Sequence, residues 1–328
     1  MISVQYPGKL FILGEYSIME PGNSAIIVSV NRYLSASLKK SDNLLIMSDY
    51  GILNQENIMN NKDMKHVQMA YTLAKELIEY KGKEICPFEL TITSQLNSKD
   101  NKKYGFGSSG VVIVAVLDII LKFHDIYLSK LELFKLAVVT QKRMGELSSG
   151  GDIAASIYQG LISYRRYNLD NVKSDVSCVY EDWDYLTIEN MKNSYTIEVG
   201  WTQKSHDTNN ALNSLKVLKE TQNSFYRELL DEANNLVVNA IKEKDILPYI
   251  SHYRNWMLKL SKALDYEIET PRLRDLIESA NALGYVSKIS GSGGGDCGIA
   301  ISLKNKNNKA LKKVWEDHNI EIIQEAII

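Results

Sequence analysis

The chain has 328 residues, of which 45% are hydrophobic and 24% charged, and its 38 lysine and arginine residues nearly balance 40 aspartate and glutamate residues. This composition is typical of globular proteins and excludes a disordered, collagen-like or low-complexity chain. The net charge of −2 also argues against a dedicated nucleic-acid-binding protein, which usually carries a strong excess of basic residues. The length predicts two domains or one large one.

The use of cysteine and histidine argues against a disulfide framework or a metal cluster. Cys86, Cys178 and Cys297 are odd in number and far apart, and the five histidines show no metal-binding spacing. The first five residues lack the basic segment of a signal peptide. No apolar run approaches the roughly 20 residues that a membrane span needs. We therefore expect a cytoplasmic protein with buried structural cysteines.

The first half of the chain alternates short apolar or β-branched runs with turn signals, and then shows helical periodicity. Ser129 is placed to cap one of the helices. In chain order, the predicted elements are strands at residues 9–13, 25–30, 33–38 and 44–47, a helix at 65–80, a strand at 88–93, and helices at 111–123 and 129–144. A Gly/Ser stretch then leads into residues 152–158.

A polar, irregular stretch around residues 165–195 separates this half from the rest. We place a domain boundary there, which gives an N-terminal domain of residues 1–194 and a C-terminal domain of residues 195–328. The predicted elements of the second half are a strand at 195–202, helices at 208–244, 246–264 and 271–283, a strand–glycine turn–strand at 287–303, a helix at 308–318 and a final strand. The predicted class is α+β in two halves.

Residues 105–110 (Gly-Phe-Gly-Ser-Ser-Gly) directly precede an apolar helix and follow Lys102 and Lys103. Glycines let the backbone approach a ligand closely, and the unpaired amides at a helix N-terminus attract anions. The lysines add positive charge, and the serines add hydroxyls that can contact phosphate or magnesium. We interpret this stretch as a phosphate-binding loop in preference to a flexible linker.

The same stretch matches two other patterns by its spacing. Gly105, Gly107 and Gly110 fit the GxGxxG of dinucleotide sites, and Val112 extends it to the protein-kinase form. A dinucleotide site requires a strand that runs into the first glycine, whereas residues 94–103 are polar. A protein kinase requires HRD and DFG segments, and the sequence contains neither. The Walker pattern fails as well, so all three interpretations are excluded.

Two further segments contain residue types suited to phosphate chemistry. Residues 7–16 (Pro-Gly-Lys-Leu-Phe-Ile-Leu-Gly-Glu-Tyr) place Lys9 at the start of an apolar strand. A charge there requires a partner or a shifted pKa, unless the lysine lies on an edge strand and reaches solvent. Residues 288–298 (Lys-Ile-Ser-Gly-Ser-Gly-Gly-Gly-Asp-Cys-Gly) contain more glycines than a hairpin needs. A backbone that wraps around a phosphorylated ligand would need them.

Together with residues 151–156 (Gly-Asp-Ile-Ala-Ala-Ser) and 199–202 (Val-Gly-Trp-Thr), these segments resemble the GHMP kinases in their order and spacing. This superfamily includes galactokinase, homoserine kinase, mevalonate kinase and phosphomevalonate kinase, and the chain looks most like its bacterial phosphomevalonate branch. The resemblance spans nearly the whole chain. It implies a two-domain α+β fold, with an N-terminal half like ribosomal protein S5 domain 2 and a ferredoxin-like C-terminal half. The active site would lie between them.

The resemblance also implies a reaction. The expected activity is transfer of the ATP γ-phosphoryl group to (R)-5-phosphomevalonate, which gives (R)-5-diphosphomevalonate and ADP in the mevalonate pathway of isoprenoid biosynthesis. The implied cofactors are ATP and Mg²⁺, and the implied partners are small-molecule substrates, with no nucleic acid and no membrane. A homodimer is left open.

Residue roles follow from matched positions in the family pattern. Lys9, Lys103 and Asp152 are expected to be catalytic, with Lys9 neutralising charge and Asp152 acting as a base or an orienting charge; Ser109 is the expected Mg²⁺ ligand. The expected ATP-binding residues are Lys103, Tyr104, Gly105, Gly107, Ser108, Ser109 and Gly110. The expected substrate-binding residues are Lys9, Tyr16, Ser149, Gly151, Trp201, Ser292, Gly293 and Gly294. Because a phosphomonoester is largely anionic at pH 7, it needs no strong base, and we expect Lys9 to matter more than Asp152.

The chain departs from the superfamily pattern in several places. The glycine loop commonly ends in alanine where this chain has Gly110, which should loosen the start of the helix. Residues 203–208 replace a Gly-Ser-Pro-Ala segment, so no acceptor contacts are carried over to them. Glu146 is a candidate second magnesium ligand by proximity alone. The alternatives are mevalonate kinase, the related diphosphomevalonate decarboxylase, another GHMP kinase, or a metabolite-binding regulator without turnover.

Overall fold

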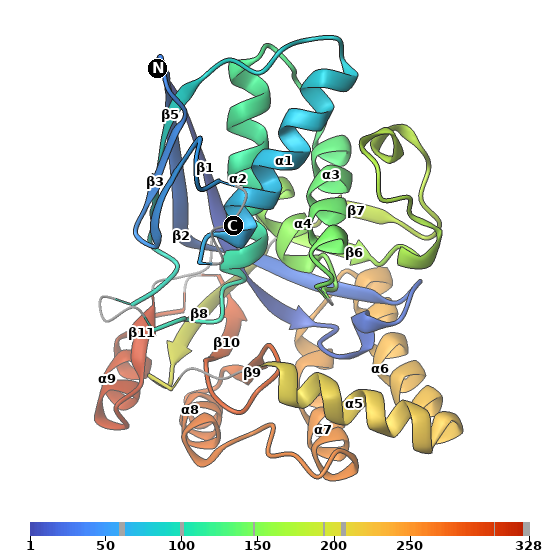
Figure 1. Ribbon diagram of the computed structural model, residues 1–328. Coiled ribbons are helices and arrows are strands. Elements are labelled where there is room, and N and C mark those ends of the chain that lie inside the picture. Colours follow the sequence, from blue (N-terminus) through green and yellow to red (C-terminus); the bar gives the residue numbers. More distant parts are fainter. Residues whose placement is uncertain are drawn as a thin grey trace.

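The computed structural model describes residues 1–58, 63–98, 102–146, 148–192, 194–204, 208–304 and 306–323. Two β-sheets, each accompanied by helices, meet near the middle of the molecule (Figure 1). The first sheet and its helices come from the first half of the chain, and the second sheet and its helices come from the second half. Residues 205–207, part of the segment that departs from the family pattern, lie outside the described residues.

The first sheet has seven strands, and a single long strand organises it. β2 (Ser24–Lys40) pairs antiparallel with β1 (Ile2–Leu13) along one edge and with β5 and then β6 along the other. The register of the β1–β2 pair shifts between Pro7 and Lys9, where the buried end of β1 begins. The other strands are β3 (Leu45–Ser48), β4 (Gly51–Asn54), β5 (Phe88–Ser94), β6 (Leu161–Arg165) and β7 (Thr187–Asn190).

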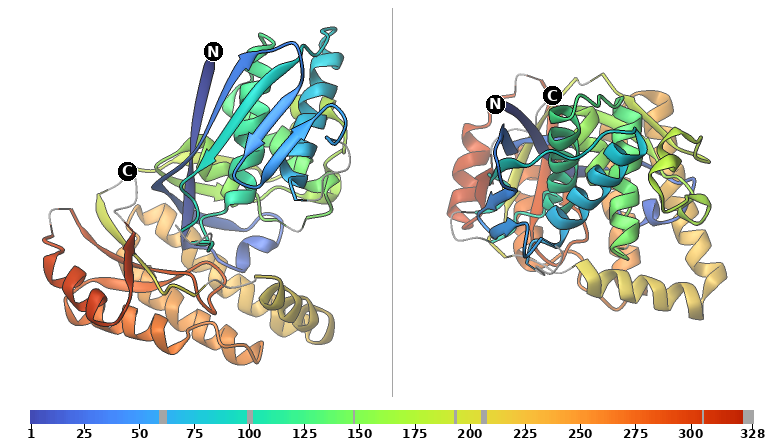
Figure 2. Two further views of the ribbon diagram at one scale, coloured as in Figure 1. Left: turned by 60° about the vertical axis from the view of Figure 1, so that its left-hand side comes forward. Right: turned by 45° about the horizontal axis from the view of Figure 1, so that its top comes forward.

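Four helices lie on one side of this sheet (Figure 2, left). They are α1 (Lys65–Tyr80), α2 (Ser108–Phe123), α3 (Lys130–Arg143) and α4 (Gly151–Tyr158). α2 is apolar around nearly its whole circumference because it packs against the sheet and against the other three helices. The expected cap of α3 is confirmed: Ser129 Oγ accepts a hydrogen bond from the Glu132 amide, and the Glu132 carboxylate accepts one from the Ser129 amide.

The second sheet has four antiparallel strands in the order β11-β8-β10-β9. These strands are β8 (Tyr195–Trp201), β9 (Val286–Ser290), β10 (Cys297–Leu303) and β11 (Glu321–Ile323). The helices α5 (Thr208–Thr221), α6 (Asn223–Glu243), α7 (Leu247–Ala263) and α8 (Pro271–Ala282) follow β8, and α9 (Lys309–Asp317) follows β10. Numbered within this half, the strand order is 4-1-3-2, and the layout is β-α-β-β-α-β with extra helices, which is ferredoxin-like.

Helix α6 of the second half also contacts the first half. α6 packs on β2, where the Ser24 amide donates to Asn234 Oδ1 (2.8 Å). The Tyr226 hydroxyl donates to the carboxylate of Glu20 (2.6 Å), in the turn that follows β1. These contacts fix how the second half sits against the strands that carry the candidate site.

The structure corrects several predicted elements. The helix predicted over residues 208–244 is two helices that meet at Gln222, and the strands predicted at 25–30 and 33–38 are one continuous strand, β2. β4, β6 and β7 were not predicted, because they are short and partly polar.

Cys178 and Cys297 are buried as expected, whereas Cys86 is exposed. Among the described residues, no helix is long and apolar enough to cross a membrane. The boundary at residue 194 stays a prediction.

Candidate active site

A cavity of about 740 Å³ is lined by residues from both halves of the chain. Lys9 comes from β1, Ser109 from the start of α2, Asp152 from α4 and Ser292 from the turn after β9. These residues are far apart in the sequence, and they converge because the buried end of β1 contacts α2, α4 and β9. The three motif segments therefore share one site.

The glycine loop (residues 105–110) presents the N-terminus of α2. Gly105 and Gly107 have φ values of +85° and +72°, in the left-handed region that favours glycine. The N-cap residue Gly107 has no side chain to cap the first amides of α2, and one of these amides, that of Gly110, donates to the Asp152 carboxylate. The Lys9 amide anchors the loop to β1 by donating to the Phe106 carbonyl oxygen (3.0 Å). Uncapped amides at a helix N-terminus, together with the helix dipole, form an anion site.

Lys9 and Asp152 lie on either side of Gly107. A Cβ atom built on Gly107 would lie 2.7 Å from Asp152 Cβ and 3.1 Å from Lys9 Cε. Burial lowers the pKa of the Lys9 ammonium group, while the charges of Asp152 and Glu15 oppose this shift. Burial likewise raises the pKa of the Asp152 carboxyl group, and the Lys9 charge opposes it. Each side chain thus helps the other to remain charged in a poorly solvated wall.

The absence of a side chain at Gly110 makes room for the Asp152 carboxylate. A Cβ atom built on Gly110 would lie 2.3 Å from Asp152 Oδ2, closer than any real contact. The Asp152 carboxylate also accepts backbone hydrogen bonds, including one from the Ile153 amide (3.0 Å). The departure from alanine at this position therefore lets the carboxylate reach the first turns of both α2 and α4.

The glycine-rich turn (residues 291–296) approaches the glycine loop directly. A Cβ atom on Gly105 would lie 2.8 Å from Asp296 Oδ2. Gly293 and Gly294 have positive φ values, and the Gly294 amide donates to the Ile268 carbonyl oxygen (2.8 Å), so the turn is held against the segment before α8. The many glycines of this turn are explained by close backbone approach as well as by φ.

The expected site residues fall into two groups. Ten of them line the cavity: Lys9, Tyr16, Lys103, Gly105, Gly107, Ser108, Ser109, Ser149, Asp152 and Ser292. The others do not: Tyr104, Gly110, Gly151, Trp201, Gly293 and Gly294. Tyr104 and Trp201 are buried and pack edge-to-face with ring centroids 4.8 Å apart, so they support the glycine loop from the protein interior. The ligand contacts of all these residues stay predictions.

Arg166 is a buried cation that the sequence did not single out. Its guanidinium donates to the carbonyl oxygens of Ile18, Met19 and Ser148, three residues of the cavity wall. Within the described ranges, no carboxylate forms an ion pair with it. It therefore ties the turn after β1 to the segment before α4 and leaves a positive charge behind the wall. No local motif marks this arginine, because its partners are backbone atoms.

A second group, of which the sequence reasoning named Glu146 alone, lies at the start of α1. Lys65 Nζ and His66 Nε2 contact the Glu146 carboxylate at 2.8 and 2.9 Å, and these partners lower the pKa of Glu146 to about 2. All three residues line the cavity. A neighbouring pocket of about 240 Å³ shares Lys65, His66, Lys103, Ser108 and Ser109 with it and continues between apolar side chains such as Met64, Ile92 and Val112.

Comparison with known families agrees with this geometry. The model of the GHMP kinases N terminal domain matches residues 67–160, and the model of the GHMP kinases C terminal domain matches residues 249–321. The two matches together span about half of the chain and bracket the site from both sides. The chain belongs to the GHMP kinases.

Particular members of the family are similar to most of the chain. A phosphomevalonate kinase of Streptomyces sp. (strain CL190) is 29% identical, over 94% of this chain and 92% of the relative. The structure of Streptococcus pneumoniae phosphomevalonate kinase in complex with phosphomevalonate and AMPPNP superposes with a TM-score of 0.89, at 28% identity and full coverage of both chains. A Lin0012 protein from Listeria innocua has a TM-score of 0.92, at 28% identity over 98% of this chain and 96% of that one.

Proposed function

We propose that this protein is a phosphomevalonate kinase, which transfers the γ-phosphoryl group of ATP to the phosphate of (R)-5-phosphomevalonate. The observation that carries the proposal is the cavity that joins the N-terminus of α2, where the N-cap is a glycine, with Lys9 and the glycine-rich turn. Such a cavity can hold two phosphorylated molecules end to end. The similarity to phosphomevalonate kinases over most of the chain supports the choice of acceptor.

The reaction requires two anions to meet, so charge neutralisation and alignment are its main demands. An acceptor phosphate oxygen attacks the γ-phosphorus, the bond to the bridging β-phosphate oxygen breaks, and ADP leaves. The acceptor is already anionic near neutral pH, so no residue has to remove a proton from it. Lys9 is placed to neutralise the approaching phosphoryl groups, and Asp152 keeps Lys9 charged and oriented. Lys103, from the opposite wall, adds charge near the nucleotide phosphates.

The neighbouring pocket is suited to the nucleoside end of ATP. It opens from the glycine loop, where the phosphates would bind, and its apolar walls match the face of a flat base. Tyr50 and Asp49 at its rim offer polar contacts for the ribose or the base edge. The nucleotide would thus run from this pocket along the start of α2, with its γ-phosphate toward Lys9.

The oxygen donors at the site fit a magnesium ion that is bound mainly through ATP. Ser109 and Glu146 line the cavity near the glycine loop. In the part of the chain that the structure describes, no cluster of three or more His, Cys, Asp or Glu side chains could hold a metal by itself. This matches the preference of Mg²⁺ for substrate phosphates, water and one or two protein oxygens. When bound, the ion would neutralise charge on the β- and γ-phosphates. Ser109 would contact it, with Glu146 as a second candidate ligand.

The proposal is tested by ADP release from Mg·ATP with 5-phosphomevalonate, mevalonate or 5-diphosphomevalonate offered separately. We expect turnover with 5-phosphomevalonate alone. Turnover with mevalonate would favour the mevalonate kinase alternative, and turnover with 5-diphosphomevalonate would favour the decarboxylase. No turnover with any of them would favour a binding regulator. A cytoplasmic location and a homodimer stay predictions.

A further inference from the structure

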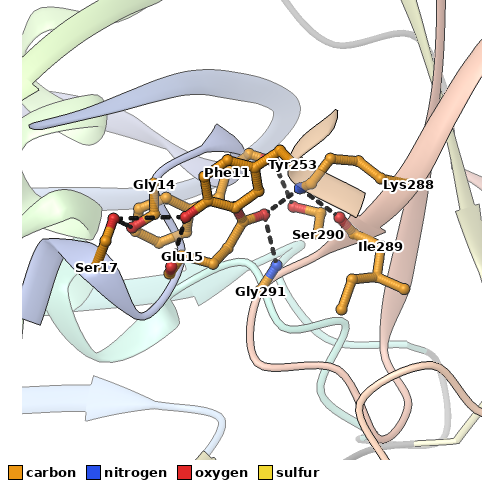
Figure 3. Close-up of polar contacts among 9 residues, drawn as sticks. All are labelled: Phe11, Gly14, Glu15, Ser17, Tyr253, Lys288, Ile289, Ser290 and Gly291. Carbon is orange, nitrogen blue, oxygen red and sulfur yellow. Dashed lines mark hydrogen bonds and ion pairs between the residues drawn. The ribbon is translucent and has the colours of Figure 1, made fainter. Parts of the chain in front are cut away.

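The end of β1 and the residues just after it contact the end of β9 and the start of the glycine-rich turn (Figure 3). Lys288 Nζ forms an ion pair with Glu15 Oε1, and the same carboxylate oxygen lies 3.4 Å from the Gly291 amide, which donates to it. Ser290 Oγ donates to the Phe11 carbonyl oxygen (2.9 Å). The Tyr16 hydroxyl, just beyond, donates to the Ser292 carbonyl oxygen. One short segment of the first half thus holds the start of the turn at four points.

The two charges of this set are sealed inside the protein. Lys288 is completely buried and Glu15 is 3% exposed. A buried ion pair generally stabilises a protein no better than apolar side chains of similar volume, because both charges lose their hydration. Stability alone therefore does not explain the pair. Its partners suggest a geometric role, since one side of Glu15 meets the turn and the residue also lines the cavity.

The backbone around Glu15 is strained in a way that supports this role. Tyr16 has a φ of +61°, which is unfavourable for a residue with a side chain. The Glu15 carbonyl oxygen accepts a hydrogen bond from the buried Tyr253 hydroxyl of α7 (2.7 Å), and this hydroxyl also lies 3.4 Å from Ser17 Oγ. The turn after β1 is therefore held from both halves in a conformation that it would not adopt by itself.

We propose that Glu15 and Lys288 are a positioning pair, which fixes the glycine-rich turn in register with the strand that carries Lys9. Lys9 and Glu15 lie on one continuous segment, and Ser292 lies two residues after the end of β9, the strand that carries Lys288. The pair therefore sets the distance between the lysine that neutralises the transferred group and the turn expected to cover the acceptor. Neither residue has to touch the acceptor for this. The acceptor used in the test comes from the proposed function, but the position of the turn does not depend on it.

The test is the apolar double variant Glu15→Leu/Lys288→Met, which removes both charges without leaving one unpaired. We expect a thermal unfolding midpoint close to that of the wild type. We also expect kcat/KM for the acceptor to fall about 100-fold, as small misplacements of reacting groups do, with KM for ATP changed less than twofold. A double variant with wild-type kcat/KM for the acceptor would overturn the proposal. So would a rise in KM for ATP as large as the rise in KM for the acceptor.

Asp118→Asn is the matched control. Asp118 is a buried carboxylate that contacts β1 through the Tyr6 hydroxyl (2.7 Å) and pairs with Lys122, but it does not touch the turn. This variant should lose stability and keep the wild-type kcat/KM for the acceptor. If the double variant does not fold, Ser290→Ala removes one of the four contacts without a charge change and should raise KM for the acceptor several-fold. An unchanged KM in that variant would count against the proposal.

A measurement without ligand separates this proposal from the proposed function. Amide hydrogen–deuterium exchange in peptides covering residues 288–298 should be faster in the double variant than in the wild type and unchanged in Asp118→Asn. This expectation holds even if the wild type does not phosphorylate 5-phosphomevalonate. Equal exchange in the double variant and the wild type would show that the pair does not hold the turn.

Discussion

Lys288 and Lys9 differ in how the protein compensates their positive charges. Lys288 is completely buried and forms a direct ion pair with Glu15, so its charge is neutralised within the protein. Lys9 lines the cavity, and among the described residues no carboxylate forms an ion pair with it, although the charge of Asp152 acts on it. The difference indicates what each lysine is for. Lys288 holds two parts of the structure together, and Lys9 keeps a charge available for an incoming phosphoryl group.

The largest expected effects come from replacing each of the two lysines with methionine. Lys9→Met should reduce kcat by at least about 10²–10³-fold, the usual cost of losing a group that stabilises transition-state charge, and should destabilise the protein less than Lys288→Met does. Lys288→Met leaves Glu15 buried and unpaired, which should destabilise the fold by about 3–5 kcal/mol. Steady-state kinetics and thermal unfolding of both variants check the contrast. A stable, inactive Lys288→Met with an unstable, active Lys9→Met would reverse our assignment.

Asp152→Asn should have a smaller effect on turnover, about tenfold, because the anionic acceptor needs no general base. Asp152 is the strongest of the charges that raise the pKa of Lys9 against desolvation. Removing this charge lowers the pKa of Lys9, so the alkaline limb of the kcat profile should move to lower pH. Measurement of kcat between about pH 6 and 10 checks this shift. A variant as inactive as Lys9→Met at every pH would show that Asp152 acts as a base.

The sequence revealed the part of the site that depends on local chemistry. Each glycine loop with its hydroxyls, and the lysine at the start of an apolar strand, is a local sequence pattern, and the three segments that carry these patterns line one cavity. Glu15–Lys288 and Arg166 could not be found this way. Their partners are distant residues or backbone carbonyls, and nothing in the local pattern distinguishes Lys288 from a surface lysine.

In the fold, too, features set by local sequence patterns were predicted, and features set by contacts between distant residues were not. The bounds predicted for α1 are confirmed to the residue, because its apolar stripe has to face a core. The division between α5 and α6 at Gln222 has neither glycine nor proline to mark it. It is set by how α6 packs on β2, and therefore by tertiary contacts that the sequence pattern does not contain.

Gly110→Ala tests the role of Asp152, the carboxylate whose charge acts on Lys9. Alanine favours helix by about 1 kcal/mol over glycine, but here its Cβ atom would displace the Asp152 carboxylate. We expect a loss of kcat of a few-fold without a gain in stability. In an Asp152→Ala background, where no carboxylate occupies that space, the same change should raise the unfolding midpoint. This double-mutant cycle isolates the contact, and additive effects in the two backgrounds would contradict it.

The smallest effect concerns cations at the rim of the cavity, where Lys65 and His66 are already paired with Glu146. These partners depress the pKa of Glu146 from 4.5 to about 2, so the ionised carboxylate stabilises the folded state at neutral pH. This contribution is fully present above about pH 4.5 and disappears as pH falls toward 2. Glu146→Gln should therefore cost on the order of 1 kcal/mol at pH 7, after allowance for solvent screening, and progressively less in acid. Urea denaturation of wild type and variant from pH 7 to pH 3 measures the difference. A constant difference in the free energy of unfolding across that range would mean that the carboxylate charge contributes nothing to stability. Lys65 and His66 would then be as available to the nucleotide as Lys9 is to the transferred phosphoryl group.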